Sequence, residues 1–302
     1  MAENKVTRIL TAAPLEIHEY LTAIGSQSPN TIDTYKRAIA RLIENLNLKS
    51  FDDFRAIAPR DALRHQQMLA GKMKASSVNT YMRPINAMYN WFVNYEYLDN
   101  NPFSRVKAMD EPQNVQTFLT RKEMREIIDN TKSTEEKLMI LLLLTMGLRR
   151  SELVNIKVDD ILGGTHIVIN GKGNKQRVLA IHDDVMPHLN LWLQIRSVKF
   201  AHRNSPYLFI SERADKYAGN TIRERLKSIM ERAGFSEERM AEIHPHTLRH
   251  TFTANLFDAD VDFYTAQMLL GHSSPQTTQR YAHLRSHRLD NAIKNQASVF
   301  DS

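Results

Sequence analysis

The sequence predicts a mainly helical protein of two domains, with a small β-hairpin or sheet in the second domain. Apolar residues recur at helical spacing over most of the 302-residue chain, which is long enough to form two cores. A polar stretch that contains a proline, residues 109–116, interrupts this pattern and predicts a linker between domains 1–108 and 117–302. Two short β-branched runs around a Gly-Lys-Gly segment predict the hairpin.

The first domain is predicted to consist of helices with one apolar face each. One helix begins near Ser28-Pro29, and its apolar face is formed by Ile32, Tyr35, Ile39, Leu42, Ile43 and Leu46. Another begins near Ser76-Ser77, and its apolar face is formed by Val78, Tyr81, Ile85, Met88, Phe92 and Tyr95. Pro84 lies inside the second helix and is expected to kink or divide it. We interpret the aromatic residues as core and not as a base-stacking surface.

The second domain is predicted to place the hairpin among helices. A buried helix is expected over residues 135–146, and Gly147 should end it. The hairpin strands are expected over 166–169 and 177–181, around the Gly-Lys-Gly segment.

Three further helix boundaries are marked in the last third of the chain. Pro245 is expected to open one helix and Gly271 to close another. Ser274-Pro275 should open a helix that carries Tyr281. The order of these signals therefore predicts a helical end to the second domain.

Composition limits the chemistry and the location of the protein. The sequence contains no cysteine, which excludes disulfides, thiolate zinc sites and cysteine nucleophiles. Its longest apolar run, 138–144, is far shorter than the roughly 20 residues of a membrane span, and the first residues lack the apolar core of a secretion signal. We therefore expect a soluble, cytoplasmic protein with no membrane partner. The net charge of +6 is compatible with a polyanion partner but does not decide it.

Four clusters of chemically active residues lie in the second domain. They are Gly147-Leu148-Arg149-Arg150-Ser151-Glu152-Leu153, Lys172 in the hairpin, His246-Thr247-Leu248-Arg249-His250 with Leu270-Gly271-His272, and Thr277-Thr278-Gln279-Arg280-Tyr281. Taken singly, each has a structural explanation. Arg149 and Glu152 could form a surface ion pair, Lys172 could be a solvated turn residue, and Tyr281 could lie in the core.

Metal sites find little support in the sequence. His246 and His250 are spaced as zinc ligands on a helix, but no acidic third ligand is evident. His272 follows a helix-ending glycine and could cap that helix. Asp159 and Asp160 are adjacent, and neighbours on an extended segment point to opposite faces. We interpret this acidic pair as structural and expect no metal.

In their order and spacing, the clusters resemble the catalytic domain of the tyrosine recombinases, also called the phage integrase family. The match covers residues 117–283 and comprises Gly-Leu-Arg-x-Ser-Glu-Leu, hairpin Gly-Lys-Gly, His-x-Leu-Arg-His, Leu-Gly-His and Thr-Thr-x-x-Tyr. The helical first part is similar to the family's SAM-like core-binding domain. Chain length and the run 270–279 look most like the Xer branch or a mobile-element relative. Arg150 and Pro84 depart from the family pattern, both outside the catalytic set.

The resemblance implies a DNA strand transferase that needs no metal, cofactor or ATP. Tyr281 would attack a DNA phosphodiester and form a 3′-phosphotyrosyl bond, which leaves a free 5′ hydroxyl. Arg149 and Arg249 would bind the non-bridging oxygens, where charge develops in the transition state, and His272 would add a hydrogen bond. Because only about one tyrosine in a thousand is ionised at pH 7, Tyr281 needs a base.

The remaining roles follow from the same resemblance. His246 is the best candidate for the base, and Lys172 would protonate the departing 5′ oxygen. Glu152 and His250 would support their neighbours. We also expect phosphate contacts, although solvated helix faces have the same residues; the candidates are Lys36, Arg37, Arg41, Lys74, Arg83, Arg150 and Lys175.

The partners implied are double-stranded DNA at a specific site and further copies of the chain. The two domains would form a C-shaped clamp around a duplex, and the family recombines as a tetramer on two DNA sites. The segment after Tyr281 is amphipathic and would dock on a neighbouring subunit, or on its own domain. Whether an accessory protein or a partner recombinase takes part stays open.

Three other activities are compatible with parts of the pattern. A type IB topoisomerase would relax supercoils as a monomer, but the small first domain and the Xer-like motifs argue against it. A telomere-resolving relative would make hairpin ends and is usually larger. A non-catalytic DNA-binding protein on this fold would be expected to lack a catalytic residue. The sequence leaves open the DNA target, and also the choice between integration or excision and dimer resolution.

Overall fold

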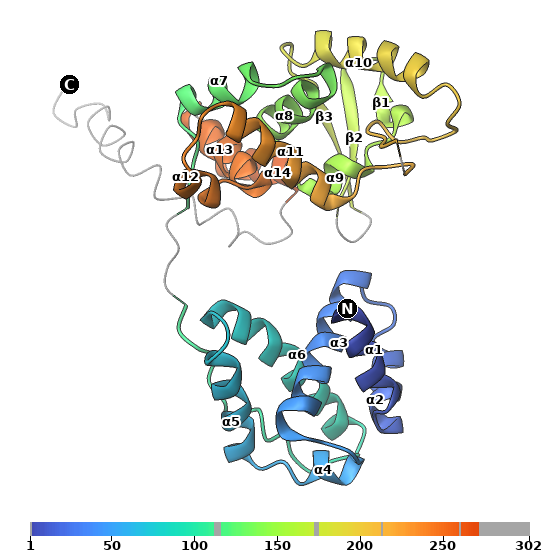
Figure 1. Cartoon of the computed structure of the whole chain (residues 1–302), viewed down its shortest axis with the longest axis vertical. Helices are drawn as coiled ribbons and strands as arrows, with labels where there is room; N and C mark the ends of the chain where they lie inside the picture. The colour runs from blue at the N-terminus through green and yellow to red at the C-terminus, as the bar shows by residue number, and fades with distance from the viewer. Residues whose placement is uncertain (1, 112–115, 172–174, 213, 260, 272–302) are drawn as a thin grey trace, which may run out of the picture. The chain divides into compact units, whose positions relative to one another are not determined.

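The structure is a computed structural model in which the chain forms two compact units. Unit 1 is Met1–Asn114 and unit 2 is Val115–Ser302, and each is described by itself (Figure 1). The structure describes residues 2–111, 116–171, 175–212, 214–259 and 261–271.

Unit 1 is built from helices packed around α3 and α6. Its described helices are α1 (Ala2–Thr11), α2 (Leu15–Ala23), α3 (Pro29–Leu46), α4 (Phe51–Arg55), α5 (Pro59–Ala70) and α6 (Ala75–Asn94). The predicted start of α3 is confirmed, because the Ser28 hydroxyl accepts a hydrogen bond from the Thr31 backbone N–H at 3.2 Å. Ile39 and Leu42 of α3 are fully buried in the core that it shares with α6.

Helix α6 runs through Pro84 as one 20-residue element, so of the two expected outcomes, a kink or a division of the helix, the division does not occur. Proline removes one backbone donor from a helix. Burial offsets this loss, because Pro84 itself and the fully buried Ile85 and Met88 pack in the core, where each large apolar side chain contributes about 1.5–3 kcal/mol. The predicted core face ends at Phe92, since Tyr95 lies just beyond the helix and is 63% exposed.

Two buried amide side chains hold the chain that leaves unit 1. Gln66 Nε2 donates to the Lys107 carbonyl at 2.8 Å. Asn79 donates to the Met109 carbonyl at 2.9 Å and accepts a hydrogen bond from the Met109 N–H at 2.9 Å. Met109, which the sequence places at the start of the linker, is therefore bound to α6.

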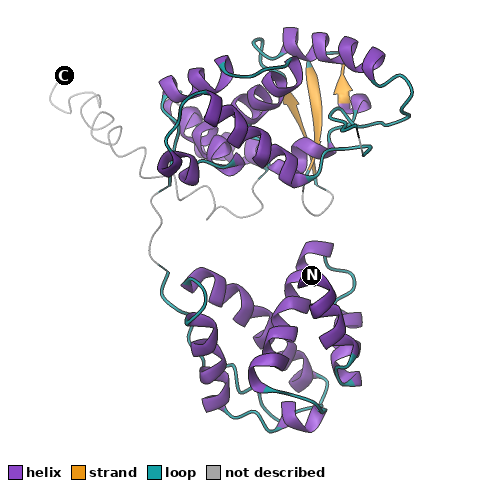
Figure 2. Cartoon of the chain, viewed as in Figure 1, coloured by secondary structure: helices purple, strands orange, loops and turns teal. Residues whose placement is uncertain are grey.

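Unit 2 combines one small sheet with helices on either side of it in the sequence. The elements before and within the sheet are α7 (Arg121–Asp129), α8 (Thr134–Met146), α9 (Arg150–Asn155), the 3₁₀ turn η1 (Val158–Asp160), β1 (Ile161–Leu162), β2 (His166–Asn170) and β3 (Gln176–Ala180). The helices after it are α10 (Met186–Lys199), α11 (Gly219–Arg232), α12 (Glu237–Glu242), α13 (Pro245–Asp258) and α14 (Phe263–Leu270). Figure 2 shows the strands together at one end of this unit.

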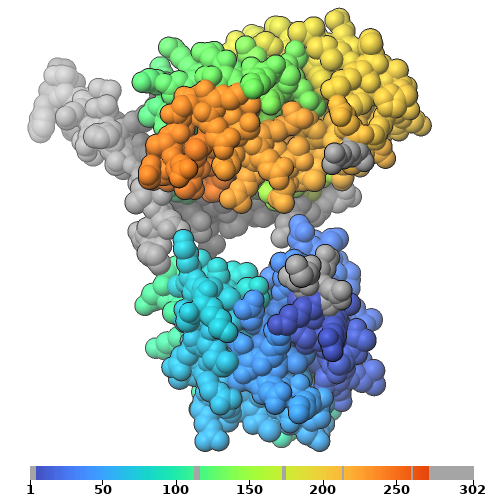
Figure 3. Space-filling model, viewed as in Figure 1, coloured from blue at the N-terminus to red at the C-terminus, as the bar shows by residue number. Residues whose placement is uncertain are grey.

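The helix predicted over 135–146 is confirmed as α8, the central helix of unit 2. Helices α7, α10 and α13 pack against it, and its run 138–144 is buried. The surface in Figure 3 shows the α7 region (green) beside the α12–α13 region (orange). An ion pair joins them, because Arg239 Nε lies 2.7 Å from Glu123 Oε1. Segments more than a hundred residues apart thus form one body around α8.

The predicted hairpin is confirmed as β2 and β3, which pair antiparallel with Val168 opposite Val178. The two-residue strand β1 adds a third strand beside β2, which sequence periodicity could not reveal because it is too short. Asp159 and Asp160 lie in the turn η1, so the expectation of an extended segment there is wrong. A single helical turn lets Asp160 Oδ2 accept the Lys157 N–H at 2.8 Å, which gives Asp160 a structural role.

These elements confirm the predicted fold class, mainly helical with one small antiparallel sheet. The predicted helix ends at Gly147 and Gly271 and the helix start at Pro245 are confirmed as well. Among the described residues, no helix is both long and apolar enough to cross a lipid bilayer.

Candidate active site

The site begins where α8 ends and α9 begins. Gly147 ends α8 in the left-handed conformation, with φ of +57°. Arg149 then occupies the position before α9, where Glu152 accepts its backbone N–H at 2.8 Å and its Nη1 at 2.8 Å. The ion pair considered in the sequence exists, but it is not a surface pair, because the Glu152 side chain is only 2% exposed. The buried carboxylate of Glu152 therefore holds both the backbone and the guanidinium of Arg149 at this short turn.

Replacing Gly147 with alanine is expected to lower the free energy of unfolding by about 2–4 kcal/mol. The left-handed conformation costs alanine about 1–2 kcal/mol, and the new methyl group would overlap the Phe252 ring. Gly234 is a matched control, since it has φ of +77° and no atom within 4 Å of an added Cβ. Gly234→Ala should lose only the stability that the left-handed backbone costs alanine. If urea unfolding shows the same loss of stability for Gly147→Ala and Gly234→Ala, the predicted overlap with Phe252 is wrong.

Arg249 links the end of α8 to the end of α14. Its side chain is 3% exposed and comes from the middle of α13. Nη1 donates to the Gly147 carbonyl at 2.6 Å, and Nη2 donates to the Leu270 carbonyl at 2.7 Å. A residue in the His-x-Leu-Arg-His motif thus joins two other motifs through their backbones.

Arg149 reaches the same end of α14. Its Nη2 donates to the Gly271 carbonyl at 3.3 Å, and Gly271 has φ of +60°, which turns the chain after the helix. The two arginines therefore converge on successive carbonyls, of Leu270 and Gly271. His272 follows directly, but His272, Lys172 and Tyr281 lie outside the described residues.

His246 lies one helical turn before Arg249 and faces other histidines. Its ring packs edge-on against His250, with 4.5 Å between the ring centroids. Partial desolvation, followed by the positive charges of Arg249, His244 and Arg149, lowers the pKa of His246 to about 4. The imidazole is therefore neutral at pH 7, which is the form that can accept a proton.

The hairpin starts beside the same carboxylate. Gly171 N–H donates to the Lys175 carbonyl at 2.7 Å, which closes the loop that contains Lys172. A Cβ on Gly171 would lie 3.7 Å from Glu152 Oε1. The base of the hairpin loop and the Arg149 turn therefore meet at Glu152, while Lys175 is exposed.

The sequence reasoning missed Arg177, the residue of β3 that holds Glu152. Its Nη1 and Nη2 donate to the two carboxylate oxygens at 3.0 and 2.9 Å. Burial alone raises the pKa of Glu152, but the hydrogen bonds and charge of Arg177, with those of Arg149, lower it to about 2. Strand alternation was the available signal, because Arg177 shares a strand face with the buried Leu179.

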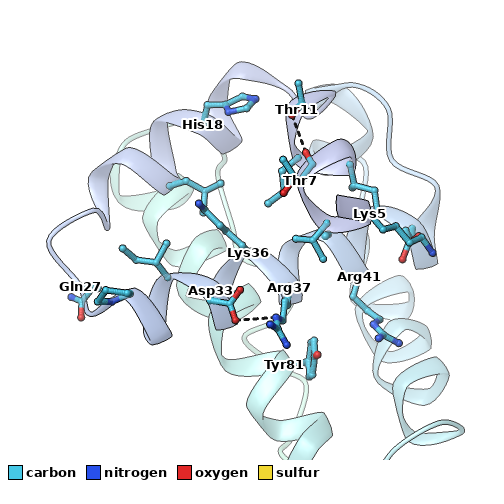
Figure 4. A pocket seen from close by; sticks show the side chains of 18 of the residues that line it. Lys5, Thr7, Thr11, His18, Gln27, Asp33, Lys36, Arg37, Arg41 and Tyr81 are labelled. Atoms are coloured by element: carbon cyan, nitrogen blue, oxygen red, sulfur yellow. Dashed lines mark hydrogen bonds and ion pairs between the residues drawn. The ribbon is translucent and has the colours of Figure 1, made fainter. Parts of the chain in front are cut away.

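The predicted phosphate contacts are divided between the units. In unit 1, Lys36, Arg37 and Arg41 of α3 line a cavity of about 760 Å³ (Figure 4). Arg37 pairs with Asp33 at 2.9 Å, and the Arg41 guanidinium lies 5.7 Å from the centre of the Tyr81 ring. The remaining candidates are exposed and lie outside this cavity: Lys74, Arg83, Arg150 and Lys175.

The model of the family described as "Phage integrase family" matches residues 117–288, more than half of the chain. The chain belongs to the phage integrase family. The matched segment contains Arg149 and Arg249, the hairpin of β2 and β3, and helix α13 with its histidines.

Similar proteins refine this membership to an Xer-like tyrosine recombinase. Tyrosine recombinase XerC of Psychromonas ingrahamii is 30% identical over 277 residues, which cover 89% of this chain and 91% of the relative. Tyrosine recombinase XerA of Pyrococcus horikoshii is 30% identical over 284 residues, which cover 92% and 91%.

Solved structures of the family share the fold. A crystal structure of XerH recombinase bound to palindromic difH substrate has a TM-score of 0.71 at 20% identity, with 87% of this chain and 79% of that chain covered. A lambda integrase dimer bound to a COC′ core site has a TM-score of 0.70 at 17% identity, with 90% and 77% covered.

Proposed function

We propose that this chain is a site-specific DNA recombinase that cuts and rejoins strands through a covalent bond to Tyr281. The family's enzymes transfer DNA strands, and the similar proteins are named tyrosine recombinases. The observation that carries the proposal is the convergence of Arg149 and Arg249 on the end of α14, beside a neutral His246. Two permanently charged guanidiniums from distant motifs can stabilise the charge that develops on a phosphate in its transition state.

The proposed reaction balances its protons within the site. The Tyr281 oxygen attacks phosphorus while the bond from phosphorus to the 5′ oxygen breaks. Tyr281 gives its proton to His246, which is neutral above about pH 4, and Lys172 gives a proton to the departing 5′ oxygen. Attack by the 5′ hydroxyl of another strand reverses both transfers. The phosphodiester energy is thereby kept in the enzyme–DNA bond, and no ATP is consumed.

The partners in this proposal are a DNA duplex with a specific site and further copies of the chain. Basic residues of both units would contact phosphates, with Lys36, Arg37 and Arg41 in unit 1. Lambda integrase has been solved as a tetramer bound to a Holliday junction. By this analogy the chain would act as a tetramer on two DNA sites, with its C-terminal segment docked on a neighbouring subunit.

Trapping the covalent intermediate tests the proposal. A cognate site is first selected from a random duplex library, and a nick beside the scissile phosphate then lets the short leaving strand diffuse away. Wild-type protein is expected to give a DNA adduct that survives denaturation. Tight binding to the selected site without any adduct would refute the proposal that the chain cleaves DNA. Binding should also weaken steeply with salt, because each neutralised phosphate releases counterions, and a flat dependence would contradict the phosphate contacts.

A further inference from the structure

Arg177 forms a bidentate ion pair with Glu152 beside the candidate site. Its guanidinium binds both oxygens of Glu152, at 3.0 and 2.9 Å, while its side chain is only 12% exposed. Such two-pronged contacts fix the relative orientation of the two groups as well as their distance. The position of the Glu152 carboxylate is therefore defined from β3, 25 residues further along the chain.

The same guanidinium also lies against two of the turns that precede predicted catalytic residues. A Cβ on Gly271 would lie 2.9 Å from Arg177 Nη1, so this glycine leaves room for the arginine. A Cβ on Gly171 would lie 3.9 Å from the same nitrogen. Gly171 precedes Lys172, and Gly271 precedes His272. Arg177 thus lies close to the base of the hairpin loop and to the end of α14 while its guanidinium binds Glu152.

We propose that Arg177 is a positioning residue, which through Glu152 orients the Arg149 guanidinium and keeps the turns before Lys172 and His272 in place. This inference rests on the proposed recombinase function and adds a residue to it. Glu152 transmits the effect, because it accepts both the backbone N–H and the Nη1 of Arg149. Misplacement by about 1 Å in such a constellation can lower a rate by about a hundredfold.

The alternative is that Arg177 only stabilises the fold, and the charge of Glu152 distinguishes the two. The charged groups that face Glu152 in the described structure are Arg149 before α9, Arg177 from β3 and Arg249 from α13, with His246 next to them. Burial favours the protonated acid, and Arg177 is the strongest opposing influence on its pKa. Without Arg177, Glu152 should take up a proton at a higher pH and stop acting as an anion for Arg149.

The pH dependence of cleavage therefore tests the proposal. In the wild type, Glu152 has a pKa of about 2 and stays ionised throughout pH 5–9. In Arg177→Met, the rate of adduct formation on the nicked cognate site should fall about 10–100-fold at pH 8, with DNA affinity unchanged within about threefold. Below pH 6 the deficit relative to wild type should grow further, by about tenfold, because the folded-state pKa of Glu152 is raised. Arg177→Lys should recover part of the rate and most of the acid tolerance.

Arg232→Met is a matched control in the same unit. Arg232 Nη2 lies 2.6 Å from Glu136 Oε2, its Nε donates to the Asn130 carbonyl, and its side chain is 20% exposed. The variant loses a half-buried ion pair without touching the site, so it should unfold more easily but keep the wild-type pH profile.

The outcomes separate the possible failures. If wild type forms no adduct, the proposed function fails, whatever Arg177 does. If wild type forms the adduct and Arg177→Met matches Arg232→Met in rate at every pH, the positioning role is wrong. Should Arg177→Met not fold, Arg177→Gln takes its place, because it also removes the charge beside Glu152, and cleavage at the wild-type rate at every pH would overturn the proposal.

Discussion

Replacing Tyr281 with phenylalanine is expected to abolish the denaturation-resistant DNA adduct, while the affinity for the selected site stays within about threefold of wild type. The change removes only the hydroxyl oxygen that would bond to phosphorus. No other group can take over at that position, because the attacking oxygen must be held in line with the departing one. The measurement combines a denaturing gel of the nicked-site reaction with an equilibrium binding assay.

Tyr264→Phe is the matched control for this prediction. Tyr264 lies on α14, close in sequence to the site, and is 70% exposed. Its phenylalanine variant should form the adduct at the wild-type rate. An adduct formed by Tyr281→Phe, or loss of the adduct in Tyr264→Phe, would contradict the assignment of Tyr281 as the nucleophile.

Arg249→Ala is expected to lower the rate of adduct formation by about a thousandfold or more, as for the loss of other strong transition-state donors. The guanidinium would supply charge to the phosphate, and it also joins the Gly147 and Leu270 carbonyls. Its loss removes the hydrogen bonds to the carbonyls of two buried residues, which should cost about 2–5 kcal/mol of stability. Single-turnover cleavage and urea unfolding must therefore be measured together.

A comparison with Arg149 separates chemistry from folding. Arg149 is 31% exposed and makes one contact with the α14 end, so Arg149→Ala should lose a similar factor in rate with a smaller loss of stability. Arg249→Lys keeps the charge but cannot span both carbonyls, so it should stay far slower than wild type. Wild-type rates in either alanine variant would contradict the assignment of that arginine.

Helix ends were the part of the fold that could be predicted best. Ser28, Gly147 and Pro245 act through their own backbone conformation or side-chain hydrogen bonds, so their effect is local and readable in the sequence. Pro84 shows the limit of local rules, because packing of the surrounding core keeps α6 continuous. Asp159 and Asp160 show the same limit, since three residues carry too little periodicity to reveal the turn η1.

The sequence by itself determined the fold class, the family and the set of residues proposed for catalysis, because motif order and helix signals are properties of the chain. Only the tertiary structure decided how part of that set meets. Arg249 reaches Gly147 across 102 residues, and Arg177 binds Glu152 across 25. Residue spacing reports contacts within a helical turn, such as Arg149 with Glu152, but long-range pairs exist only after the core of unit 2 has formed. In that core the buried Glu152 carboxylate accepts hydrogen bonds from both Arg149 and Arg177.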